Sequence, residues 1–219
     1  LFSLMDGGLK QLASHYPPMQ VAALRGLSTL PLVLAWVVAT GAVRGLFRVR
    51  WPIHLARGVL AVLMLWSFAY ALRGMPLAGA YTLFFIAPLV ITALSGPLLG
   101  ERVGPRRWTA IGIGLAGVLV VLRPTGEGMA SLPALAVLVA ATAYAVSAVL
   151  VRVAHRSDST QSLVFWMIVM TAFGAGALAW PQWLPLRAGD AWVIAGVGIA
   201  GFLGQVAITE AFRWGEASV

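Results

Sequence analysis

The stretch PLAGAYTLFFIAPLVITALSGPLLG, residues 76–100, contains no Asp, Glu, Lys or Arg. At 1.5 Å per helical residue, about 20 residues cross the hydrocarbon core of a bilayer, which is roughly 30 Å thick. Three other stretches lack these charged residues and are long enough to cross: 129–151, 159–186 and 191–209. A buried helix of a soluble protein rarely needs such length, so the pattern predicts helices that span a membrane.

Weaker apolar stretches complete the predicted topology. Residues 18–43, 53–72 and 107–122 each contain a single arginine. Residues 1–13 are expected to form another helix, whose beginning is missing. Hydrophobic residues make up 60% of the chain and charged residues 10%, which is more apolar than one soluble core of this size can bury. We therefore predict an all-α polytopic membrane protein with about eight spans.

Basic residues sort between the two sides of the membrane. Alternate connections between the eight spans must lie on opposite sides. One set, with its helix ends, holds ten arginines: Arg44, Arg48, Arg50, Arg57, Arg102, Arg106, Arg107, Arg152, Arg156 and Arg213. The other set holds only Arg73, Arg123 and Arg187. By the positive-inside rule the first set is cytoplasmic, which predicts a multi-pass protein of the cell inner (plasma) membrane with a cytoplasmic N-terminus.

Tryptophans near the ends of the predicted spans support this topology. Trp51 and Trp108 follow cytoplasmic arginines, and Trp180 and Trp183 flank Pro181 at the external end of the seventh span. Tryptophan is enriched at membrane interfaces, so we interpret these four as interface anchors. The lipid bilayer is thus an expected partner. Nucleic acid is not, because the basic residues lie in short loops beside apolar helices.

The chain also contains an internal repeat. Residues 10–36 correspond to residues 152–180, and residues 71–78 align with 211–218, with offsets near 140. Five helices separate equivalent positions, so the two repeats must be inverted relative to each other, which usually places a substrate site near the midplane. The predicted domains are 1–124, with helices one to five, and 129–219, with helices six to eight. Helices nine and ten of a ten-helix protein are expected to be missing.

Residues 97–104, PLLGERVG, followed by Trp108, Gly112, Gly117 and Arg123-Pro124, resemble the junction of helices four and five in EamA-type proteins of the drug/metabolite transporter superfamily. The opening FSLMDGGLK, residues 2–10, with Pro17 and Arg25, is similar to the subgroup that moves riboflavin, S-adenosylmethionine or opine metallophores. The resemblance implies two inverted five-helix units around a central cavity. It also implies secondary transport or export of a small metabolite by alternating access.

Charges inside spans are candidate substrate ligands, since each costs roughly 3 kcal/mol or more at mid-membrane unless it is paired or wet. Asp6 and Lys10 share a helix face at i,i+4, and the tight turn at residues 15–18 brings Arg25 to a similar depth. One hypothesis is that these three residues bind a zwitterionic or anionic substrate. The alternative is a structural clamp between the first two helices.

Glu210 is the candidate coupling carboxylate, because only Asp6 competes with it among acids in the spans. The alternative is an i,i+3 ion pair with Arg213 at the interface.

Aromatic side chains at helical spacing could stack on a flat substrate. They are Trp66, Tyr70, Tyr81, Phe84, Phe85 and Tyr144. Pro88 and Pro97 interrupt the hydrogen bonding of the fourth span, and the freed carbonyls need a neighbouring group or a wet cavity. Gln205, a further candidate substrate ligand, and Thr209 are at i,i+4 in the eighth span and are expected to face the same cavity.

Other motifs favour packing over chemistry. Gly112-x-Gly114-x-x-Gly117 and Gly196-x-Gly198-x-x-Gly201 fit the dinucleotide fingerprint, but both lie inside apolar spans and are better interpreted as helix-packing surfaces.

The histidines His15, His54 and His155 lie in separate loops, so no metal site and no cofactor is predicted. The chain has no cysteine and no catalytic cluster. We favour a small-molecule transporter over a membrane-embedded enzyme or an assembly subunit. A homodimer is an open alternative for its assembly.

Overall fold

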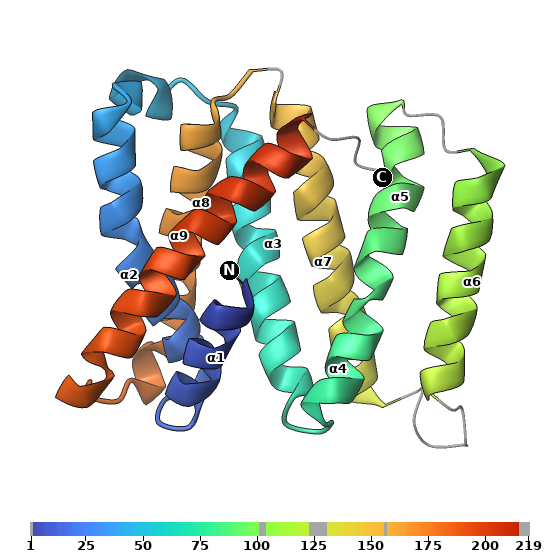
Figure 1. The fold of residues 1–219 in the computed structure, drawn as a ribbon, viewed down its shortest axis with the longest axis horizontal. Helices are drawn as coiled ribbons and strands as arrows, with labels where there is room; N and C mark the ends of the chain where they lie inside the picture. The colour runs from blue at the N-terminus through green and yellow to red at the C-terminus, as the bar shows by residue number, and fades with distance from the viewer. Residues whose placement is uncertain (1, 101–103, 123–130, 156, 215–219) are drawn as a thin grey trace. The chain divides into compact units, whose positions relative to one another are not determined.

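A computed structural model describes residues 2–100, 104–122, 131–155 and 157–214, and all regular structure within these ranges is helical (Figure 1). The α-helices are α1 (Phe2–Ala13), α2 (Pro18–Ala39), α3 (Trp51–Ala71), α4 (Leu77–Phe84), α5 (Ile86–Leu99), α6 (Pro105–Leu122), α7 (Leu132–His155), α8 (Thr160–Ala179) and α9 (Ala191–Trp214). Short 3-10 turns are η1 (Ala42–Leu46), η2 (Trp180–Gln182) and η3 (Ala188–Asp190). The side chains of Asp6, His155 and Arg213 lie outside the description.

The predicted spans coincide with helices. Among the described residues, six stretches are long and apolar enough to cross a membrane: Pro18–Ala39, Trp51–Ala71, Leu77–Leu99, Leu132–Ala154, Thr160–Gln182 and Ala188–Ala211. Neither α1, which has 12 residues, nor α6 is among them. The chain is therefore an all-helical, multi-pass membrane protein. The ten-helix count and the inverted repeat stay predictions.

Two prolines and a tryptophan-rich turn modify these spans. The span Leu77–Leu99 breaks at Phe85, between α4 and α5. The predicted effect of Pro88 explains the break, because proline cannot donate to the carbonyl four residues earlier. Pro97, in contrast, lies inside α5. The charge-free stretch 159–186 extends beyond the helix: α8 ends at Ala179, and η2 with its own proline follows.

The described chain forms two compact units. The first comprises 1–62 with 154–214, and the second contains 63–153, so α3 contributes to both. In the first unit α2 lies antiparallel to α8. Gln20, at the start of α2, bonds to Leu184 beyond the end of α8. Trp166, near the start of α8, donates to the carbonyl of Leu46 after α2.

Small residues allow close helix packing in the first unit. A Cβ on Gly26 of α2 would lie 2.7 Å from the Cβ of Ala172 in α8, and one on Gly198 of α9 would lie 2.7 Å from the carbonyl oxygen of Ser28 in α2. Lipid tails are as apolar as leucine, so close van der Waals contact of this kind holds membrane helices together. The predicted packing role is confirmed for Gly198, whereas Gly112 and Gly117 of α6 have no described atom near a Cβ.

The second unit has its own core. One cluster of its buried apolar residues comes from α3, α4 and α7: Ala71, Ala80, Leu83, Ala134 and Val137. Four of the five are alanine or valine, so α4 and α7 pack with little intervening side-chain volume. This places the aromatic residues that border the cluster, Phe68 and Phe84, against one another.

Candidate functional site

Arg25 lies where α1, α2 and α9 meet in the first unit. Its Nε is 3.8 Å from the position that a Cβ on Gly201 of α9 would occupy, and the sulfur of Met5 in α1 is equally near that position. Thr29, one turn further along α2, donates to the Arg25 carbonyl at 2.7 Å and to the Gly198 carbonyl at 3.3 Å. A half-buried guanidinium is thus held among three packed helices, within a membrane span.

The other two members of the predicted charged network are not placed with Arg25 by any described contact. Lys10 is exposed on α1. The side chain of Asp6 is outside the described set, so the predicted Asp6–Lys10 pair stays a prediction. Of the two candidates whose side chains are described, Arg25 is the one that lies among packed helices.

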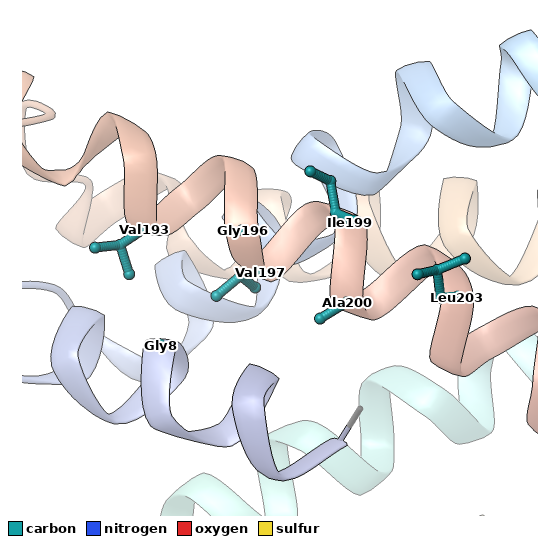
Figure 2. Close-up of a pocket in the computed structure, with 7 residues that line it drawn as sticks. All are labelled: Gly8, Val193, Gly196, Val197, Ile199, Ala200 and Leu203. Atoms are coloured by element: carbon teal, nitrogen blue, oxygen red, sulfur yellow. The ribbon is translucent and has the colours of Figure 1, made fainter.

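An apolar groove of about 390 Å³ runs between α1 and α9 (Figure 2). Its lining residues are Gly8, Val193, Gly196, Val197, Ile199, Ala200 and Leu203. None of these side chains can donate or accept a hydrogen bond. The described lining therefore offers no side chain that could orient a zwitterionic or anionic substrate.

Five of the six predicted aromatic residues fall into two groups, both in the second unit, and the sixth, Phe85, is exposed. Tyr81 and Phe84 of α4 each lie 5.6 Å from the ring of Phe68, and Tyr144 of α7 lies 5.7 Å from Phe84. Phe68, which the sequence analysis missed, joins the group because it is on the α3 face that meets α4. Trp66 and Tyr70 form a separate stacked pair at 6.0 Å, and both side chains are exposed.

Polar residues of α9 contact one another and α8. Gln205 donates to the hydroxyl of Thr209 at 3.4 Å, as their i,i+4 spacing allows. The carboxylate of Glu210 accepts a hydrogen bond from the hydroxyl of Thr160, at the start of α8. The predicted alternative partner of Glu210, Arg213, has its side chain outside the description. Glu210 is thus tied to a neighbouring helix, a contact that its i,i+3 spacing to Arg213 did not predict.

A buried histidine–aspartate pair was missed by the sequence analysis. His54 Nε2 of α3 lies 2.8 Å from Asp158 Oδ2, in the turn between α7 and α8, and both side chains are 1% exposed. The backbone N–H of Arg50 donates to the same oxygen at 3.3 Å. The prediction that His54 lies in a loop was wrong: it is on the first turns of α3, and its face of the helix is buried against the turn before α8.

Arg57 is part of the same region. It was counted with the basic residues at the cytoplasmic helix ends. Only 2% of it is exposed, and its Nη1 donates to the Leu163 carbonyl of α8 at 3.3 Å. Within the described residues, Asp158 Oδ1 and Arg57 Nε have no hydrogen-bond partner. We call His54, Arg57 and Asp158 the buried acid–base cluster. The i,i+3 spacing of His54 and Arg57 on an otherwise apolar helix was the available sequence signal.

A second histidine–aspartate pair lies at the other end of the first unit. Asp190 Oδ2, in η3, accepts from the hydroxyl of Tyr16 at 2.7 Å and lies 3.1 Å from His15 Nδ1. The backbone N–H of Arg187 donates to the Tyr16 hydroxyl at 2.9 Å. The α1–α2 turn is thereby fastened to the segment that leads into α9. Neither pair recruits a third ligand: in the described part of the chain, no three His, Asp or Glu side chains gather in a metal-binding group.

Comparisons with known proteins agree on a family. Residues 3–123 match the EamA-like transporter family. The chain is 26% identical over 219 residues to the pseudopaline exporter of Pseudomonas aeruginosa, covering all of this chain and 76% of that protein. It is 28% identical over 207 residues to the riboflavin transporter of Vibrio cholerae, covering 92% of this chain and 68% of that protein.

Two further comparisons extend this result. The S-adenosylmethionine uptake transporter of Rickettsia prowazekii is 25% identical over 182 residues, covering 83% of this chain and 61% of that protein. A solved crystal structure at 21% identity superposes with a TM-score of 0.76 over 97% of this chain and 74% of that one. At that identity the likeness shows the fold alone.

Proposed function

Because this chain belongs to the EamA-like transporter family, a family of small-molecule membrane transporters, we propose that the protein works by alternating access. We further propose that Arg25 binds the transported substrate. The observation that carries the proposal is the position of Arg25 at the junction of α1, α2 and α9. A half-buried guanidinium within a span is retained where it pairs with an anionic group or borders water, and Arg25 already has an interaction within the protein. A carboxylate or phosphate of a metabolite would be an additional anionic partner.

The relatives' names support an organic metabolite as the substrate class. They are named as carriers of pseudopaline, riboflavin and S-adenosylmethionine. In the second unit, Tyr81, Phe84 and Tyr144 form with Phe68 a group of rings suited to stacking on a flat substrate. We therefore propose a zwitterionic, anionic or aromatic metabolite as cargo.

Alternating access would arise from the proposed inverted repeat. The corresponding helices of the two repeats, α2 and α8, pack antiparallel in the first unit, which supports an inverted relation. Rocking of one repeat against the other would then expose Arg25 to each side in turn. The N-terminus and the end of the first unit that carries Asp158 are proposed to face the cytoplasm, since Arg44, Arg48 and Arg50 are at that end.

Transport by the full-length protein in proteoliposomes tests the site. Labelled riboflavin and S-adenosylmethionine serve as probes, with Arg73→Ala as the matched control because Arg73 lies in the exposed turn after α3. We expect Arg25→Ala to raise the KM of the transported probe by about tenfold or more, the equivalent of one charge-assisted hydrogen bond. An unchanged KM in Arg25→Ala, with normal protein abundance, would remove Arg25 from the site.

A further inference from the structure

The buried acid–base cluster is incompletely bonded. Asp158 is 4% exposed, and its two described hydrogen bonds both go to Oδ2, from His54 and from the Arg50 backbone. Oδ1 has no described partner, and neither has the Nε of Arg57. An unpaired buried polar atom is costly, and most native structures avoid it. Such atoms are expected where a second protonation state or a second conformation satisfies them.

We propose that the His54–Asp158 pair binds and releases the proton that couples transport to the transmembrane pH gradient, an inference that rests on the proposed transport function. A proton binds to the pair in one conformation of the protein and leaves it for water in the other. Only O–H and N–H bonds form and break, and no electron is transferred. Asp158 Oδ1 is the free acceptor atom on the carboxylate, and the second ring nitrogen of His54 is the other site that protonation can use.

The helices in contact with the cluster explain how the proton would act on conformation. His54 and Arg57 are on α3, Asp158 precedes α8, and Arg57 also bonds to the Leu163 carbonyl of α8. The pair therefore ties α3 to the start of α8. Neutralising the carboxylate weakens a charge-assisted hydrogen bond to an ordinary one, so proton binding loosens this tie. Two protonation states would thus favour two positions of α3 relative to α8.

The other charged groups nearby are less suited to the role. Arg50 contributes its backbone to the pair while its residue is exposed, and Arg57 supplies the buried positive charge. From α9, Glu210 approaches through Thr160, which follows Asp158 by two residues, and Glu210 has partners already. From the α7 side, His155 and Arg156 precede the turn, and their side chains lie outside the description.

Transport by the full-length protein in proteoliposomes distinguishes a loss of proton coupling from a loss of folded structure. With labelled riboflavin or S-adenosylmethionine as probe, accumulation driven by a pH gradient is compared with exchange at equal pH. We expect Asp158→Asn to lower gradient-driven accumulation at least about tenfold and to leave exchange within about twofold, as when a proton relay is blocked and the cavity is intact. The matched control Asp190→Asn alters the other histidine–aspartate pair and should preserve both. Wild-type gradient dependence in Asp158→Asn would overturn the proposal.

A measurement without substrate keeps the two proposals distinguishable. Infrared titration of the full-length protein in lipid follows protonation of carboxyl groups directly. We expect a carboxyl protonation signal that Asp158→Asn removes, that His54→Gln alters and that Asp190→Asn leaves in place. Identical titrations in wild type and Asp158→Asn would refute proton binding at the pair. If the expected titration is present but no probe is transported in either mode, the assigned substrate class fails and the proton site stands.

Discussion

The first unit holds two histidine–aspartate pairs, one at each end, that differ in how completely they are bonded. Asp190 receives hydrogen bonds from Tyr16 and His15, and the His15 side chain is 30% exposed. Asp158 is held by His54 with both side chains 1% exposed, and one of its oxygens is unpartnered among the described residues. The same two side-chain types therefore form a more completely hydrogen-bonded pair at the Asp190 end, which we call the latch. At the Asp158 end they form an incompletely bonded pair, which we call the poised pair.

The difference follows from the local chain. At the Asp190 end, the turn between α1 and α2 offers a tyrosine hydroxyl, and the irregular segment after α8 offers free backbone groups. At the Asp158 end, the carboxylate accepts from one side chain, His54, and from one backbone group, the N–H of Arg50, and both bonds go to the same oxygen. No described group bonds to the other oxygen. A buried carboxylate whose oxygens are not all hydrogen-bonded is a group whose state proton binding can change.

Removing the histidine of each pair should give the largest difference in unfolding stability between the two ends. His54→Ala leaves the buried Asp158 carboxylate with only the Arg50 N–H, so we expect unfolding stability to fall by about 3 kcal/mol. His15→Ala should lower it by less than about 1 kcal/mol, because water reaches His15. Thermal unfolding of the full-length protein in detergent measures both. Adding Asp158→Asn to His54→Ala should restore much of the loss, since the amide carries no charge to leave unpaired.

The double-mutant cycle sharpens this prediction. The coupling energy between His54 and Asp158 should clearly exceed that between His15 and Asp190. Equal coupling energies at the two ends would mean that burial does not distinguish the pairs. The poised pair would then be a second latch.

Gln20 provides the next largest expected effect, at the latched end. Its amide accepts from the Leu184 N–H at 2.9 Å and donates to the Leu184 carbonyl at 2.7 Å, with the residue fully buried. Gln20→Leu removes both bonds and leaves two backbone groups unpaired. We expect a loss of about 2 kcal/mol in unfolding stability. Gradient-driven accumulation of the probe should keep its wild-type pH dependence, and a changed pH dependence would assign coupling to this end instead.

Much of the fold was predictable because the bilayer imposes it. Helix length against hydrocarbon thickness placed the spans, and the missing N–H of Pro88 predicted a break that the structure puts at Phe85. The end of α8 was not predictable from hydropathy, because the apolar stretch continues beyond Ala179 through Trp180, Pro181 and Trp183. There the proline and the 3-10 turn, not polarity, end the helix.

The candidate site was predicted less completely. Arg25 was identifiable as a charge within a span, and the Gln205–Thr209 contact followed from helical spacing. Asp158 was not identifiable, since the sequence places it in a short polar turn among His155, Arg156 and Ser157. Its burial depends on α3 packing over that turn, which is tertiary information. Long-range contacts of this kind leave no local pattern in one sequence.

Thr160 gives the smallest expected effect and separates the two coupling candidates. Its hydroxyl donates to Glu210, and Thr160→Val removes that bond while keeping a similar shape. Because Glu210 has a further interaction, we expect only about 1 kcal/mol of lost stability. If the Asp158 pair carries the proton, gradient-driven accumulation should keep its wild-type pH dependence. A displaced pH profile in Thr160→Val, with a wild-type profile in Asp158→Asn, would transfer the coupling role to Glu210.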